Sequence, residues 1–303
     1  MKKIWSAIGT KVKNCTTPAE ALEAAGLDWE VAPKPMYYRG TDGKVRSVPD
    51  MQANIRSDTQ AVIGIVSTRY QRVQNARAFE WTAQLKTEGA TFDYMGQTRG
   101  GRRVFLVARL MEEIEILGDT IAQYVCVSTT HDGSGKFEIA LLPVNELTGV
   151  LLNIGIRNAK RGWAIKHIGD LDNKMKMTAE TIRGSHEYAM AVDETARKLA
   201  SIALTTEKWE SVCERVVGHL PEGASERAAS QWQERFEALR ANIKIPELKR
   251  HADNGWGAVN AVSRYLSNAV PQRKSDGWKE SRFERFISGE ARLDAALEEI
   301  LAD

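Results

Sequence analysis

The stretch from Tyr124 to Leu142, YVCVSTTHDGSGKFEIALL, contains two alternating apolar segments on either side of the pentapeptide His131-Asp132-Gly133-Ser134-Gly135. Alternation of apolar and polar residues is typical of a half-buried strand. Asp-Gly and Ser-Gly supply residues that tolerate positive φ, which a tight chain reversal requires. The stretch therefore predicts a β-hairpin whose turn is the pentapeptide.

Extended patterns also precede this hairpin. Residues 29–73 contain several segments rich in Val and Ile with Gly and Pro between them, and residues 91–110 alternate around a turn at Arg99-Gly100-Gly101. Thr17-Pro18-Ala19-Glu20 has the form of a helix start, with a hydroxyl cap and proline at the first helical position. These patterns predict a β-rich N-terminal half with antiparallel hairpins and a few helices.

Helical periodicity follows the hairpin. One expected helix runs through Asn158, and its apolar face contains Val144, Leu147, Leu151 and Ile154. From Leu171 to about Ala203, apolar residues again recur at helical spacing, and helix starts and amphipathic segments continue to the end of the chain. We therefore expect an α+β protein with a β-rich α+β domain at residues 1–170 and a helical region at residues 171–303.

Composition limits the protein class. A chain of 303 residues with 43% apolar content can bury a core in one large or two moderate domains. Its 42 Lys and Arg oppose 40 Asp and Glu, so the net charge of +2 does not by itself indicate a nucleic-acid partner. Three widely spaced cysteines favour a reducing compartment. Without a signal-like apolar segment or the ~18 apolar residues of a membrane span, we expect a cytoplasmic protein.

Two groups of residues could support catalysis by a hydrolase or nuclease. His131 and Asp132 could act as a base and its partner, but the sequence marks no further group that converges on them. The acidic residues around Glu112-Glu113 could hold Mg²⁺, although their alternation is that of a solvated strand edge. Histidine spacing fits no zinc site, and the phosphate-binding motif GxxxxGK[ST] does not occur. We expect a protein that is not an enzyme, with no catalytic residue, metal site or cofactor.

Three basic clusters are more informative. Residues 97–110 and residues 156–169 each contain four Lys or Arg and no acid, and Arg69-Tyr70-Gln71-Arg72 is a third cluster. Single strands are bound by cations along the phosphates and by aromatic rings against the bases, each stack being worth ~1–3 kcal/mol. The expected nucleic-acid-binding residues are Arg69, Tyr70, Arg72, Arg99, Arg102, Arg103, Arg157, Lys160, Arg161, Trp163 and Lys166.

Each cluster also has a structural explanation. Arg157, Lys160 and Arg161 would lie at the C-terminus of the expected helix, where cations offset the macrodipole by roughly 0.3–1 kcal/mol without a ligand. Trp163 and Tyr70 could belong to the core. A single cluster is most often an ordinary solvated face, but three clusters in the β-rich half favour nucleic acid.

Five blocks of sequence support a resemblance to a known family: LDWEV (27–31), YQRVQN (70–75), HDGSG (131–135), IKHIGDLDNKM (165–175) and WGAVNAVSRYL (256–266). On these blocks the chain resembles the phage/plasmid-like protein family, whose central domain is of unknown function. The resemblance covers nearly the whole chain and implies a phage, prophage or conjugative plasmid in a bacterial host. The organisation, with a basic and aromatic sheet before a helical tail, is also similar to Red-beta and RecT-like single-strand annealing proteins.

We therefore expect a single-stranded DNA-binding, annealing-type protein that acts in recombination or replication of a phage or plasmid. Its partners would be single-stranded DNA, further copies of the chain in a ring or filament, and a phage exonuclease or single-strand-binding protein. The alternative is a protein-interaction module that inhibits or redirects a host factor, in which case the basic clusters are incidental.

Overall fold

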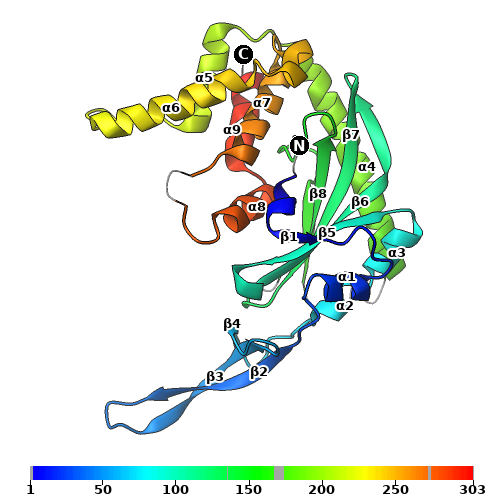
Figure 1. Cartoon of the computed structure of the whole chain (residues 1–303), viewed down its shortest axis with the longest axis vertical. Helices are drawn as coiled ribbons and strands as arrows, with labels where there is room; N and C mark the ends of the chain where they lie inside the picture. Colours follow the sequence, from blue (N-terminus) through cyan, green and yellow to red (C-terminus); the bar gives the residue numbers. More distant parts are fainter. Residues whose placement is uncertain (1–2, 135, 167–173, 272–273, 303) are drawn as a thin grey trace.

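The computed structural model describes residues 3–134, 136–166, 174–271 and 274–302. The α+β fold predicted from the sequence is confirmed, because the antiparallel sheets lie in the N-terminal half and long helices make up the C-terminal half (Figure 1). Within the described residues, the strands form one six-stranded sheet and one three-stranded sheet.

The six-stranded sheet, here the large sheet, is antiparallel throughout. In spatial order its strands are β1 (Gly9–Lys11), β5 (Thr91–Thr98), β6 (Arg103–Ile116), β7 (Asp119–Thr130), β8 (Lys136–Asn145) and β9 (Gly162–Lys166). Thr129 pairs with Phe137, which confirms the hairpin predicted around the HDGSG pentapeptide. The predicted β5–β6 turn is also confirmed and contains the short helix η2 (Arg99–Gly101).

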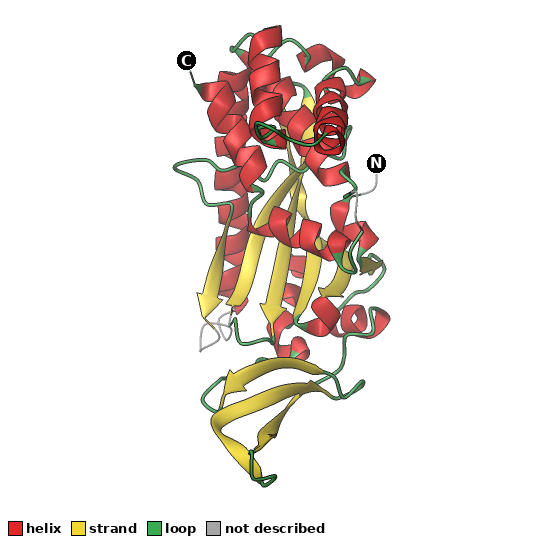
Figure 2. Cartoon of the chain, turned by 90° about the vertical axis from the view of Figure 1, so that its left-hand side faces the viewer, coloured by secondary structure: helices red, strands yellow, loops and turns green. Residues whose placement is uncertain are grey.

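The three-stranded sheet, here the small sheet, has the order β2-β3-β4. Its strands are β2 (Val31–Arg39), β3 (Val45–Arg56) and β4 (Val62–Ser67). Figures 1 and 2 show that this sheet lies beyond one end of the large sheet and extends away from the rest of the molecule. We call the hairpin of β2 and β3, residues 31–56, the arm.

Helices cover both faces of the large sheet. On one face lies α4 (Lys174–Ala200), whose Ser185 hydroxyl donates to the Gln123 side chain of β7. On the other face, the Phe283 ring of α8 (Trp278–Ser288) lies 4.4 Å from that of Phe105 in β6. Phe105 pairs with Ser128 of β7, so these two side chains point to the same face of the sheet. Ser128 is an odd number of residues from Gln123 along β7, and the side chains of Phe105 and Gln123 therefore point to opposite faces. The sheet is therefore buried between helices (Figure 1).

The remaining helices are short segments near the N-terminus or belong to the helical C-terminal half. They are η1 (Ile4–Ala7), α1 (Pro18–Ala24), α2 (Asn75–Phe79), α3 (Thr82–Thr87), α5 (Thr206–Val217), α6 (Glu226–Asn242), η4 (Pro246–His251), α7 (Gly255–Asn268) and α9 (Ala291–Leu301). The predicted cap of α1 is confirmed, because the Thr17 side chain accepts a hydrogen bond from Glu20 N. No helix in the described ranges combines the length and apolar character needed to cross a bilayer.

One continuous hydrophobic core links the two halves. It runs from Trp5 through the large sheet to Ile300 of α9, and Tyr188 of α4 donates to Ile154 O at 2.7 Å. The division into residues 1–170 and 171–303 stays a prediction. The change from strands to helices does occur near that position, although α4 completes the layer over the sheet.

The helix expected from Val144 to Asn158 is wrong. Strand β8 continues to Asn145, and Gly149 N donates to Asn145 O at 2.7 Å with Gly149 at φ +65°. Leu151 then pairs back with Val144 as an isolated bridge. A tight reversal therefore replaces the helix, and residues 157–161 have no macrodipole to offset.

Candidate nucleic-acid interface

The HDGSG turn lies where the small sheet meets the large sheet. Asn54 Nδ2 of β3 donates to His131 O at 2.8 Å. A Cβ on Gly64 of β4 would lie 2.5 Å from His131 O and 2.6 Å from Asp132 Cα, so glycine is needed for this close approach. The turn is thus a docking surface for the small sheet.

The His131 side chain is part of the same junction. It is 1% exposed, and its Nε2 lies 2.8 Å from Asn75 Oδ1. Because Asn75 Nδ2 donates to Leu27 O, the Asn75 oxygen is the acceptor and His131 Nε2 carries the proton. The Trp29 ring packs edge-on against the imidazole at 5.4 Å between centroids. Three of the five blocks behind the family resemblance therefore meet here, in a buried polar network.

Asp132 has a separate local role. Its Oδ1 accepts hydrogen bonds from Ser134 N at 3.0 Å and from Ser134 Oγ at 2.6 Å, the pattern of an Asx turn. The geometry of His131 and Asp132 is thus accounted for by the fold. Among the described residues, no group of three His, Cys, Asp or Glu side chains could hold a metal ion.

Four of the predicted cations hold protein elements together. Arg99 forms an ion pair with Glu284 of α8, and Arg103 pairs with Glu138 at 2.5 Å. Arg161 pairs with Asp294 of α9 at 2.8 Å, and Arg72 Nε donates to Asn54 Oδ1 at 2.8 Å. A paired guanidinium must exchange its partner before it can bind phosphate, so these residues are poorly placed as primary contacts. Their assignment as nucleic-acid-binding residues stays a prediction.

Four other predicted cations are exposed and form no ion pair with any described residue: Arg69, Arg102, Arg157 and Lys160. The first two belong to segments that both contact the end of β7, because Arg102 O accepts from His131 N and the hydroxyl of Tyr70, the residue after Arg69, donates to Thr130 O. The other two lie in the loop before β9, on a separate surface. Trp163 of β9 packs against Gly184 of α4, and the Lys166 side chain lies outside the described residues.

The arm contains cations and aromatic rings that the sequence analysis did not select. Tyr37 and Tyr38 are 62% and 51% exposed, and as neighbours in β2 they point to opposite faces. Three exposed cations accompany them without an ion pair to any described residue: Lys34, Arg39 and Lys44. The signal was the segment YYRGTDGKVR (37–46), where two tyrosines and three cations surround one aspartate.

Arg56 holds the base of the arm against the large sheet. Its guanidinium lies 4.4 Å from the centre of the Trp29 ring and donates to Gly100 O at 3.1 Å. It also pairs with Asp58 at 2.6 Å, and this hydrogen-bonded ion pair holds the pKa of the Asp58 carboxyl below its usual value. The base of the arm is therefore fixed, while its outer part faces solvent.

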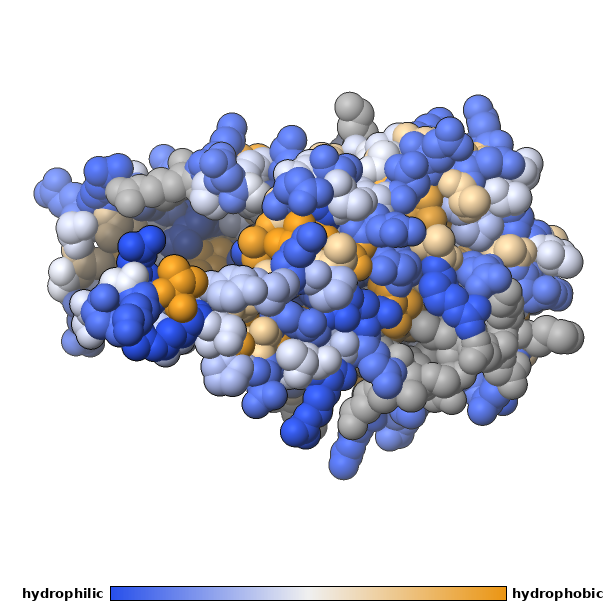
Figure 3. Space-filling model, turned by 90° about the horizontal axis from the view of Figure 1, so that it is seen from below, coloured by the Kyte–Doolittle hydropathy of each residue, from blue (hydrophilic) through white to orange (hydrophobic). Residues whose placement is uncertain are grey.

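The outer strand β4 also exposes apolar side chains. Val62 is 54% exposed and Ile65 is 53% exposed, on the strand that forms one edge of the small sheet. Viewed from the end at which the small sheet lies, hydrophobic side chains reach the surface in separate places between hydrophilic ones (Figure 3). The surface around the arm is thus mixed in character.

In a comparison with protein-family models, residues 62–287 match a domain of unknown function, DUF932. The chain belongs to the DUF932 family. Four of the five blocks quoted above lie inside the DUF932 region, which begins at β4, whereas the whole arm precedes it. No curated protein and no solved structure matches the chain.

Proposed function

We propose that this DUF932 protein binds single-stranded DNA through the arm and the adjoining cations Arg69 and Arg102, and that it acts by binding rather than by catalysis. The observation that supports this most is the arm itself, with two exposed tyrosines among three cations that form no ion pair in the described part of the chain. Tyrosine is well suited to such a surface, because its ring is large and loses little conformational entropy on contact.

Each arm residue has a defined part in this proposal. Lys34, Arg39 and Lys44 neutralise phosphates, which makes binding depend on salt. Tyr37 and Tyr38 stack with bases on opposite faces of the hairpin, each contact contributing ~1–3 kcal/mol. Because stacking and phosphate contacts do not distinguish one base from another, binding is independent of sequence.

The biological setting in this proposal is recombination or replication of a phage or plasmid. The sequence resemblance to the phage/plasmid-like family supports the setting, and the organisation similar to Red-beta and RecT-like annealing proteins supports the reaction. In that arrangement, further copies of the chain extend the bound strand as a ring or filament, and a phage exonuclease or single-strand-binding protein supplies or protects it.

A protein-interaction function is the second candidate, and one observation favours it. Strand β4 is an edge strand with Val62 and Ile65 exposed, and open edges can pair with a strand of another protein. In this case the β4 edge would bind a host factor and inhibit or redirect it, and the arm cations would have no part in the function.

Fluorescence anisotropy with a labelled oligodeoxythymidine tests the first candidate. The double variant Tyr37→Ser, Tyr38→Ser should weaken binding at least about tenfold, because it removes two stacking contacts. Its matched control is the double variant Leu147→Ser, Leu220→Ser, which changes two exposed apolar side chains elsewhere and should bind like the parent. Equal affinity of the tyrosine variant and the parent would contradict the proposal.

A further inference from the structure

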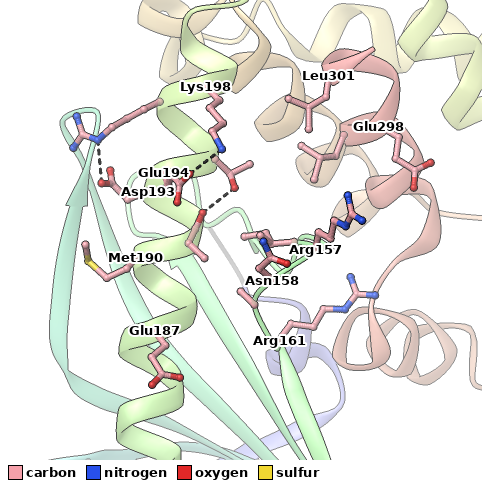
Figure 4. Close-up of a pocket in the computed structure, with 17 residues that line it drawn as sticks. Arg157, Asn158, Arg161, Glu187, Met190, Asp193, Glu194, Lys198, Glu298 and Leu301 are labelled. Atoms are coloured by element: carbon pink, nitrogen blue, oxygen red, sulfur yellow. Dashed lines mark hydrogen bonds and ion pairs between the residues drawn. The ribbon is translucent and has the colours of Figure 1, made fainter. Parts of the chain in front are cut away.

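A pocket separate from the arm lies between α4 and the edge of the large sheet. It has a volume of about 530 Å³ and lies between α4, the loop before β9 and Trp163. It is continuous with a longer cleft of about 1270 Å³ that reaches α9, because both are lined by Asn158, Ala159, Glu187 and Ala191 (Figure 4). The size of the pocket is typical of small-molecule sites.

An aromatic ring forms one wall of this pocket. Trp163 lies in edge strand β9, and its ring packs on Gly184 in the middle of α4. A Cβ on Gly184 would lie 3.3 Å from Trp163 Cζ3, a tight contact that would require the ring to shift by a few tenths of an ångström. Glycine inside a helix costs about 1 kcal/mol relative to alanine, and here the cost is offset by close packing of the indole.

The charges around the cleft leave room for one anionic group. Three cations are each neutralised by a carboxylate: Arg161 by Asp294 at 2.8 Å, Arg197 by Asp193 at 3.0 Å and Lys198 by Glu194 at 2.8 Å. Lys160 lines the pocket and Arg157 lines the cleft; both are exposed in the loop and form no ion pair with a described residue. The exposed carboxylate of Glu298 also lines the cleft and forms no ion pair with a described residue. Two cations suit a single phosphate group.

Hydrogen-bonding groups complete the pocket. The Asn158 side chain is exposed at the point where the pocket and the cleft join, and Figure 4 shows it beside Arg157. On the opposite wall, Glu187 is paired only loosely, with its Oε1 3.7 Å from Arg183 Nε. An amide and a carboxylate beside an aromatic wall can accept hydrogen bonds from sugar hydroxyls and exocyclic amines.

We propose that this pocket binds a nucleoside phosphate. The base stacks against Trp163, the phosphate lies between Lys160 and Arg157, and Glu187 accepts a hydrogen bond from the sugar. The ligand is either a free mononucleotide or one nucleotide of a strand, since both present the same ring, sugar and phosphate. The site does not depend on the arm.

Isothermal titration of the full chain with adenosine 5′-monophosphate tests the pocket. The parent should bind, and Trp163→Leu and the double variant Arg157→Ala, Lys160→Ala should each weaken binding at least tenfold. Adenosine and inorganic phosphate should each bind more weakly than the nucleotide. The matched control Lys244→Ala removes an exposed lysine of the helical half and should bind like the parent.

The same variants, measured with an oligodeoxythymidine, distinguish the two sources. If mononucleotides do not bind but Trp163→Leu and Lys160→Glu weaken strand binding, the ligand is one nucleotide of a strand. Lys160→Glu keeps the test decisive should Trp163→Leu fail to fold, because Lys160 is exposed. The proposal is overturned if neither Lys160→Glu nor the double variant changes the affinity for the mononucleotide or for the strand. The arm variant Tyr37→Ser, Tyr38→Ser should retain mononucleotide binding, so failure of one proposal leaves the other standing.

Discussion

The substitution Gly64→Ala should destabilise the protein by loosening the small sheet from the HDGSG turn. The added Cβ would lie 2.5 Å from His131 O and 2.6 Å from Asp132 Cα, about 1 Å inside ordinary van der Waals contact. Both neighbours are backbone atoms, so the strand must move instead of a side chain. Overpacking of this kind typically costs about 1–3 kcal/mol.

Movement of β4 away from the turn also stretches the hydrogen bond from Asn54 to His131 O, which adds about 0.5–1.5 kcal/mol. The total expected loss in the free energy of unfolding is therefore about 1.5–4.5 kcal/mol, measured by urea denaturation followed by circular dichroism. Gly40→Ala is the matched control in the small sheet, because its Cβ would meet only the flexible side chains of Arg46 and Asp42. If both variants unfold at the same urea concentration as the parent, the close packing of β4 on the turn is refuted.

Two further predictions concern buried side chains. His131→Ala should lower the free energy of unfolding by about 2–4 kcal/mol, because it leaves a cavity beside Trp29 and removes the partner of Asn75; an unchanged urea midpoint would contradict this. Iodoacetamide at pH 8 should label Cys15 in the native protein and leave Cys126 and Cys213 unmodified, because burial raises the pKa of both thiols to about 12. Mass spectrometry checks the labelling, and rapid modification of Cys126 without denaturant would contradict its burial.

The local features of the fold could be predicted from the sequence, because they depend on neighbouring residues. The HDGSG hairpin, the turn at Arg99-Gly100-Gly101 and the cap at Thr17 each follow from turn or cap chemistry within a few residues. The helix expected after Val144 was wrong because one local signal was given too much weight and another too little. Its apolar spacing fits a helix, but Gly149 at positive φ permits a reversal that places Leu151 back beside Val144.

Features that depend on distant residues could not be predicted. The burial of His131 depends on Asn75 and Trp29, which no local pattern connects to the turn. The loop at residues 157–161 contains no acid in its sequence, yet Asp294, 133 residues away, neutralises Arg161. The exposure of the arm tyrosines could not be predicted either, because strand patterning does not show whether another layer covers the strand.

The proposed function requires the arm to bind single-stranded DNA through its cations and tyrosines. The most direct measurement is the salt dependence of affinity for an oligodeoxythymidine, compared between the parent and the triple variant Lys34→Ala, Arg39→Ala, Lys44→Ala. Each phosphate contact on a single strand contributes about 0.7 to the slope of log affinity against log salt concentration. The triple variant should therefore bind more weakly at low salt, with a slope shallower by about 2.

The matched control removes three exposed cations of the helical half, Arg227, Lys244 and Lys249, and changes net charge by the same amount. If the arm is the binding surface, the control keeps the affinity and the slope of the parent while the arm variant loses both. If the arm variant and the control show the same slope as the parent, or if the parent binds no oligonucleotide at any salt concentration, the account of the arm is contradicted.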